Sequence, residues 1–111
     1  MPALEPVPGI YRFAFHDAVS VSISHYIGES ATMRRRMDDY SYPGNAPPTD
    51  ARVRDLLLAT LKNGGTARLS VVLDASFNNA PLNLTWKPAR LLVENAAIIA
   101  SATSGVKVQN L

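Results

Sequence analysis

Cysteine is absent from the chain, which excludes a disulfide framework, thiolate metal sites and cysteine nucleophiles. Long apolar runs are also absent, since no stretch approaches the roughly eighteen residues that a membrane-spanning helix needs. The N-terminal segment MPALEPVPGIY lacks the basic cluster and apolar stretch of a signal peptide. We therefore expect no membrane partner and a cytoplasmic location, or a place in the virion if the chain is phage-encoded.

Lysine and glutamate are scarce, with three of each in 111 residues, and protein interfaces tend to exclude both. Apolar residues make up 47% of the chain and charged residues 18%, a balance typical of one soluble domain with a single core. The formal net charge of +2 is a weak field for attracting polyanions. The composition thus favours contacts with other proteins or with further copies of the chain.

Three prolines lie in residues 2–9, PALEPVPG. Proline has no backbone N–H donor and holds φ at about −65°, so this spacing is typical of an extended, polyproline-like segment. We expect an extended proline-rich arm over residues 1–9, lying along its own domain or along a neighbouring subunit. A single α+β domain is expected over residues 10–111.

Period-two alternation predicts two strands after the arm, over residues 10–16 and 19–27. One face of the first strand carries aromatic side chains: Tyr11, Phe13 and Phe15. In the second strand His25 shares the apolar face, and three serines lie on the other, as in a sheet with one wetted side. Gly28 is expected to end this strand.

Two helices are predicted in the middle of the chain. The first has Ser30 as its N-cap, and its inward face is formed by Met33, Met37 and Tyr40. The second has Thr49 as its N-cap and stops at Gly64 and Gly65. Its apolar face is formed by Val53, Leu56, Leu57, Thr60 and Leu61.

The C-terminal half predicts a hairpin, because residues 66–74 and 82–87 both alternate and are joined by a short asparagine-containing loop. Residues 89–101 fit either a helix beginning at Pro88 or a strand. The helical stripe would be Leu91, Leu92, Asn95, Ala96, Ile98 and Ile99. Gly105 then turns the chain into a short last strand.

These elements predict a single α+β domain. Its mainly antiparallel sheet has four to five strands, made of two hairpins and a C-terminal strand, and two or three helices cover it on one side.

Three consecutive arginines, Arg34–Arg36, precede aspartates at positions 38 and 39. On a helix two of these arginines meet an aspartate four residues later, and three successive residues spread over about 200°. Both facts indicate a solvated, locally neutralised surface. The alternative is a contact surface for nucleic acid or a partner, with tyrosines for stacking. Its residues would be Arg34, Arg35, Arg36, Tyr40, Tyr42, Arg52 and Arg54. No recognised nucleic-acid-binding module accompanies them.

His16, Asp17 and His25 are the candidates for an enzyme or ligand site. The alternation places the two histidines on different faces of a hairpin, which favours turn chemistry for His16-Asp17 and a hydrogen-bonded structural role for His25. The histidine spacing matches no metal motif. The sequence therefore assigns no catalytic, cofactor-binding or metal-binding residues, and an enzyme is the less favoured class.

The hypothesis favoured by the sequence is a non-enzymatic assembly subunit that self-associates or packs on a larger complex, such as a phage or virus structural component. The arm could lie over a neighbour, and the last strand could extend a neighbour's sheet. One alternative is a small basic nucleic-acid-binding protein that uses the region of Arg34–Arg36. A second is a small enzyme or ligand-binding protein that uses His16, Asp17 or His25.

Overall fold

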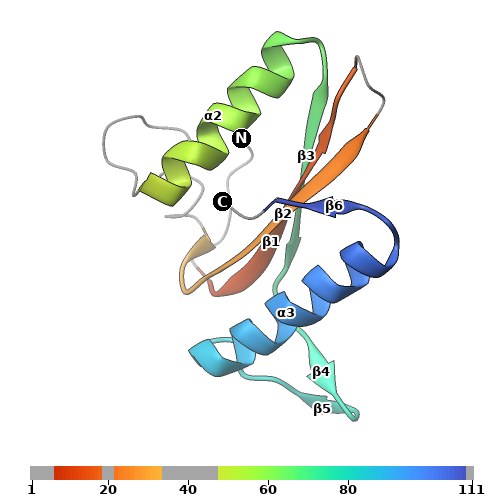
Figure 1. Ribbon diagram of the computed structural model, residues 1–111. Coiled ribbons are helices and arrows are strands. Elements are labelled where there is room, and N and C mark those ends of the chain that lie inside the picture. The colour runs from red at the N-terminus through yellow and green to blue at the C-terminus, as the bar shows by residue number, and fades with distance from the viewer. Residues whose placement is uncertain (1–6, 19–21, 34–47, 110–111) are drawn as a thin grey trace.

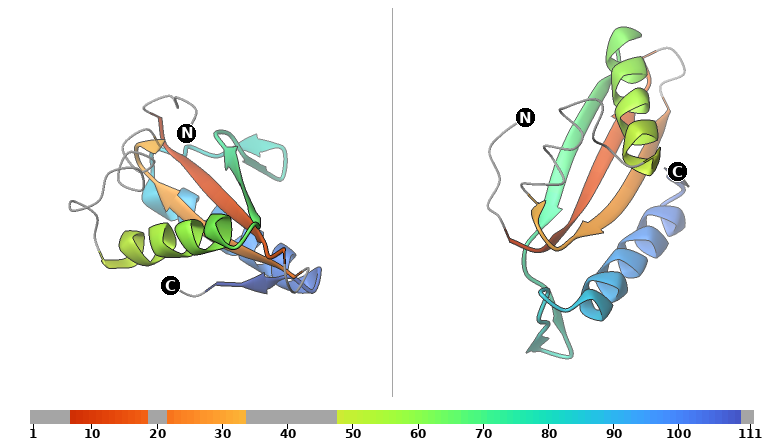
Figure 2. Two further views of the ribbon diagram at one scale, coloured as in Figure 1. Left: turned by 90° about the horizontal axis from the view of Figure 1, so that it is seen from above. Right: turned by 90° about the vertical axis from the view of Figure 1, so that its left-hand side faces the viewer.

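The computed structural model describes residues 7–18, 22–33 and 48–109. They form a four-stranded sheet in the order β3-β1-β2-β6, a separate two-stranded hairpin and two helices (Figures 1 and 2). The main strands are β1 (Gly9–His16), β2 (Ile23–Ser30), β3 (Thr66–Val72) and β6 (Lys107–Val108); the helices are α2 (Pro48–Lys62) and α3 (Lys87–Thr103). Antiparallel pairing joins β1 to β2 and β3, and β6 pairs with β2 in parallel. The predicted α+β class with a mainly antiparallel sheet is confirmed.

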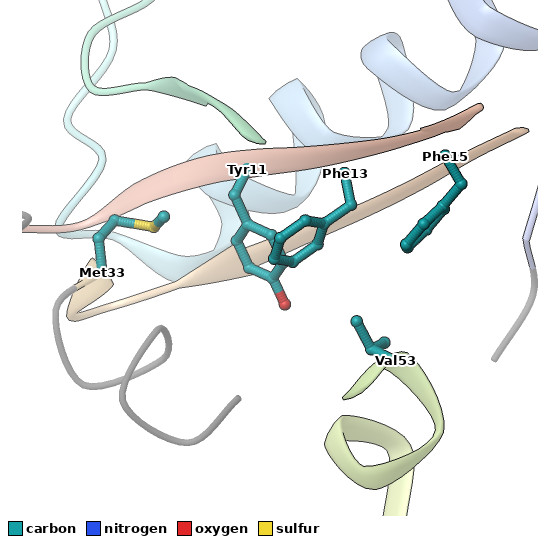
Figure 3. Packing of buried hydrophobic residues seen from close by; sticks show 5 residues of the cluster. All are labelled: Tyr11, Phe13, Phe15, Met33 and Val53. Atoms are coloured by element: carbon teal, nitrogen blue, oxygen red, sulfur yellow. The ribbon is translucent and has the colours of Figure 1, made fainter. Parts of the chain in front are cut away.

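One face of the sheet packs against α2. Tyr11, Phe13 and Phe15 project from β1 to this side and surround Val53 of α2, which is completely buried (Figure 3). The Tyr11 and Phe13 rings meet edge to face at 6.0 Å, an arrangement that favours aromatic pairs beyond their burial. The period-two pattern of β1 therefore predicted this core correctly.

The opposite face packs against α3, where Ile10 and Ile27 contact Leu84 and Ala89. The helices thus cover both sides of the sheet, and the prediction that they share one side is wrong. The sequence pattern missed the second apolar face because its apolar residues are confined to one end of β1 and β2. The alternation of β2 was recognised, but its apolar residues were assigned to the same face as Phe13 and Phe15.

Gly28 lies within β2 and does not end it. It pairs with Tyr11 of β1, and a Cβ added at Gly28 would overlap the ring and hydroxyl of Tyr11. The tyrosine ring therefore covers the glycine, a pairing that makes strand glycines tolerable. The strand continues to Ser30, whose hydroxyl oxygen accepts a hydrogen bond from the backbone N–H of Thr32 at 3.1 Å. Residues 19–21 of the predicted strand lie outside the described residues.

α2 was predicted as a helix, and a helix was one of the two alternatives for the α3 segment, but the buried face of α3 differs from the predicted one. α2 begins at Pro48, next to the expected cap, and ends before Gly64, whose φ of +81° is a left-handed conformation suited to glycine. Of the three face residues given for the expected earlier helix, only Met33 lies within the described residues, and its expected cap, Ser30, is the last residue of β2. Residues 89–101 are helical within α3, which decides the choice that the sequence left open.

The buried face of α3 differs from the predicted stripe. Ala89, Arg90 and Ser101 are buried, and Val93, Ala97 and Ile98 pack beside them. Of the predicted inward residues, Leu91, Leu92 and Ile99 are exposed. The side of α3 that meets the sheet carries Arg90 together with the small and apolar residues Ala89, Val93, Ala97 and Ile98.

Arg90 is a buried ion-pair partner at the junction of α3 and β2. Its Nε donates a hydrogen bond to Glu29 Oε2 at 2.6 Å, and its Nη1 donates to the carbonyl oxygens of Leu84 and Thr85 at 3.0 and 3.1 Å. Only 5% of Arg90 is exposed. A buried charge is costly unless it is paired in this way, so the contact determines how α3 is oriented on the sheet.

The second hairpin is smaller than predicted. β3 pairs with β1, while β4 (Ser76–Phe77) and β5 (Ala80–Pro81) form a separate hairpin. Its two turn residues, Asn78 and Asn79, have φ values of 50° and 64°, as a two-residue primed turn requires. The predicted strand over residues 82–87 is wrong: residues 82–86 form the turn that leads into α3, and Lys87 is the first residue of the helix.

Neither helix in the described part of the chain is both long enough and apolar enough to cross a membrane.

Replacing Arg90 tests its role. We expect Arg90→Met to lower the free energy of unfolding by about 2–4 kcal/mol, because Glu29 and two carbonyl groups would lose their donor. Arg52→Met on the exposed surface of α2 is the matched control, with an expected change within about 0.5 kcal/mol. Urea unfolding measures both. Equal effects of the two variants would contradict a dominant role for the buried pair.

Gly28→Ala tests the contact with Tyr11. The added methyl group should overlap the ring and lower the free energy of unfolding by about 1–3 kcal/mol. In a Tyr11→Val background the same change should cost nothing or stabilise slightly, since alanine loses less conformational entropy than glycine. A double-mutant cycle by urea unfolding measures the coupling, and additive effects would show that the ring is not what excludes the methyl group.

Candidate functional site

Five of the predicted contact residues, Arg34, Arg35, Arg36, Tyr40 and Tyr42, lie outside the described residues, so their contact role stays a prediction. The other two, Arg52 and Arg54, lie on α2. Arg52 is exposed, whereas Arg54 is partly buried and its Nη1 is enclosed without a hydrogen-bond partner in the described part of the protein.

His16 and His25 lie on the same face of the sheet. His25 pairs with Ala14, and His16 pairs with Ile23, so both histidines project to the side that α3 partly covers. The prediction of different faces is wrong. It assumed that the apolar residues of β2 share a face with Phe13 and Phe15, whereas they belong to the second apolar face beneath α3.

Both histidines line an open cleft beside α3. The helix packs on β2, β1 and β6, and the part of the sheet towards β3 stays accessible. A cleft of about 270 Å³ occupies this area. We call it the basic cleft; it is lined by Arg12, Ala14, His16, Ile23, His25, Thr66 and Arg68.

His25 joins the basic cleft to α3. Its Nδ1 lies 3.0 Å from the hydroxyl oxygen of Ser101, a hydrogen bond that orients the ring. Burial lowers the pKa of His25 below its usual 6.5, and the positive charge of Arg12 lowers it further. The imidazole is therefore harder to protonate in the folded protein than in the unfolded chain.

Asp17 points away from the basic cleft. It lines a cavity of about 280 Å³ on the α2 side of the sheet, together with Phe15, Thr60 and Lys107 among others. Its backbone N–H donates to the carbonyl oxygen of Ser22 at 3.0 Å. His16 and Asp17 consequently line different cavities. In the described ranges no group of three or more His, Asp or Glu side chains is placed to hold a metal ion.

The side of α3 that faces away from the sheet is apolar and uncharged. Ile99 is 65% exposed and Leu92 49%, and Trp86, just before the helix, is 65% exposed. At 100° per residue, Leu92 and Ile99 project within about 20° of each other. We call this surface the outward face of α3; its residues are Pro88, Leu91, Leu92, Asn95, Ala96, Ile99 and Ala102.

The three charged residues of α3 lie elsewhere on the helix. Arg90 faces the sheet, and Glu94 is close enough to Glu29 to feel its charge. Burial raises the pKa of the Glu94 carboxyl, Glu29 raises it further, and Lys87 lowers it. The sequence shows that these apolar residues share one face of α3, but not whether that face is buried or exposed. The ion pair of Arg90 shows which side of the helix is inward.

Comparison with known proteins gave no match to a family model, to a curated protein or to a solved structure. Function therefore has to be inferred from the residues and geometry of the chain itself.

The lowered pKa of His25 predicts a pH dependence of stability. The unfolded chain binds more protons than the folded one below about pH 6.5, so the stability is fully present above that value and declines as the pH falls through 6.5 towards the folded pKa. His25→Gln should remove this part of the decline, and His16→Gln should keep it. Urea unfolding between about pH 7.5 and pH 5 measures the difference. An unchanged pH dependence in His25→Gln would contradict the expectation.

Proposed function

We propose that the protein is a non-enzymatic structural subunit that self-associates through the outward face of α3. The observation that carries the proposal is a three-turn apolar stripe on an exposed helix with no charged residue on it. Contiguous exposed apolar surface of this kind is a feature of protein contact sites. The scarcity of lysine and glutamate in the whole chain supports the same function.

A second copy of the chain is the partner that fits this face best. A neutral surface offers no charge complementarity to an acidic or basic partner, but it complements itself. If two copies of α3 pack antiparallel about a two-fold axis between Asn95 and Ala96, Leu92 of one copy lies opposite Ile99 of the other. Such an isologous contact is the commonest kind in oligomers. Small residues at the centre, such as Ala96, would let the helices approach closely.

Other exposed apolar side chains lack these features. Leu58 and Leu61 on α2 are 60% and 56% exposed, but Asp55 and Lys62 lie one turn away on the same surface. The last strand, β6, is an edge strand, as the sequence suggested, yet it has only two residues. The proposal covers a subunit of a cytoplasmic complex as well as a virion component, because both are assembled through contacts of this kind.

Charged substitutions on α3 test the proposal. We expect the wild-type protein to form dimers or larger oligomers that persist at high salt, because apolar contacts are not screened. Leu92→Glu and Ile99→Glu should each raise the dissociation constant by about 100-fold or more, because each places a carboxylate in the buried centre of the contact. Sedimentation equilibrium measures the association, and circular dichroism checks that the fold is retained.

Leu58→Glu is the matched control, since it places the same charge at an equally exposed leucine of α2 and should leave the oligomer unchanged. A monomeric wild-type protein, or an oligomer unaffected by both α3 variants, would disprove self-association through this face. Steeply salt-dependent retention of mixed-sequence DNA or RNA, abolished by Arg34→Ala, Arg35→Ala and Arg36→Ala together, would favour the nucleic-acid-binding alternative.

A further inference from the structure

Four basic side chains surround Ala14 in the basic cleft. Arg12 and His16 lie two residues before and after it on β1, so they share its face. His25 of β2 and Arg68 of β3 are its direct partners on the two neighbouring strands. Paired residues on neighbouring strands project to the same face of the sheet, so basic side chains lie on all four sides of Ala14.

Ala14 has only a methyl side chain, so it leaves space between the four basic side chains. Its methyl group forms the floor, and the longer basic side chains stand around it as walls of the cleft. The volume of about 270 Å³ is just below the range of about 300–1,000 Å³ that is typical of pockets for drug-sized ligands. The space therefore suits a small anion with a few additional atoms.

The positive charge of the cleft is not neutralised within the described part of the protein. Glu29 is the one carboxylate that the described strands place on this face of the sheet, and it is bound by Arg90. Arg12 and Arg68 make no ion pair with another described residue. Like charges on neighbouring positions of a sheet repel one another, so this arrangement costs folding free energy that a bound anion would recover.

The imidazole ring of His25 is also held in an orientation suited to such a ligand. Its Nδ1 is held by Ser101, which leaves Nε2 as the ring nitrogen available to the cleft. Burial lowers the pKa of this histidine, and the positive charge of Arg12 lowers it further. A bound anion would oppose the effect of Arg12.

We propose that the basic cleft binds the phosphate group of a small molecule, with Arg12 and Arg68 donating hydrogen bonds from different strands and the two imidazoles completing the set. Guanidinium groups bind both carboxylate and phosphate oxygens, and a phosphate carries more negative charge and more acceptor oxygens for a site with several donors. The described lining contains no Phe, Tyr or Trp side chain on which a nucleic acid base could stack. The site is separate from the outward face of α3, so it goes beyond the proposed self-association.

Nuclear magnetic resonance tests the proposal directly, because the chain contains only two histidines and both line the cleft. We expect the imidazole signals of His16 and His25 to shift and saturate on titration with inorganic phosphate, but not with chloride at the same ionic strength. Arg12→Gln and Arg68→Gln should each weaken the affinity for phosphate by about tenfold, as loss of a charge-assisted hydrogen bond predicts. Lys62→Gln, which removes an exposed positive charge of α2 outside the cleft, should leave the affinity unchanged.

Thermal unfolding provides a second measurement. Phosphate should raise the melting temperature of the wild-type protein, because it binds only the folded state, and should not raise that of the Arg12→Gln/Arg68→Gln double variant. Both arginines are exposed, so the variants should fold. A phosphate monoester that binds more tightly than inorganic phosphate would support an organic phosphate as the ligand, and equal affinities would support inorganic phosphate.

Three outcomes would overturn the inference. They are histidine signals that stay fixed during the phosphate titration, signals that respond equally to chloride, and a response to phosphate that persists in the double variant. Binding of a mixed-sequence oligonucleotide that inorganic phosphate does not displace would also overturn it, and would assign the cleft to nucleic acid.

Discussion

The buried guanidinium of Arg90 is the contact on which the arrangement of the molecule depends. Its pairing with Glu29 and with the carbonyl groups of Leu84 and Thr85 leaves α3 one orientation in which no buried charge lacks a partner. Because Glu29 belongs to β2, the helix lies over β2 and its neighbours and leaves the β3 side of the sheet accessible. The ion pair and the apolar packing of Ala89, Val93, Ala97 and Ile98 together place the outward face of α3 away from the sheet.

The basic cleft and the outward face of α3 are both unfavourable in an isolated protein. The outward face of α3 exposes Leu92, Ile99 and the neighbouring Trp86 to water, and the cleft brings basic side chains together without a counter-charge from the described strands. The aromatic core between β1 and α2 supplies stability that tolerates such features. Natural proteins usually break local rules of this kind at sites where a partner or ligand compensates for the cost.

Local patterns predicted much of the secondary structure and little of the candidate site. The strand carrying Phe13, the helix carrying Val53 and the helical state of α3 depend on neighbours a few residues away, and the sequence contains that information. The close approach of Tyr11 to Gly28 joins residues 17 positions apart, and a glycine viewed alone indicated a strand end. The two histidines were separated because the pattern allowed only one apolar face of the sheet.

The sequence by itself determined the α+β class, the aromatic face of β1 and the absence of cysteine chemistry, since these follow from residue types and their spacing along the chain. Tertiary structure alone decided that α3 packs on the opposite face from α2, that its leucine and isoleucine stripe faces outward, and that Arg12, His16, His25 and Arg68 surround Ala14. The physical reason is that a sequence pattern shows which side chains share a face of an element, but not which face is buried. That depends on the partner against which the element packs. For α3 that partner is Glu29, 61 residues away in the chain.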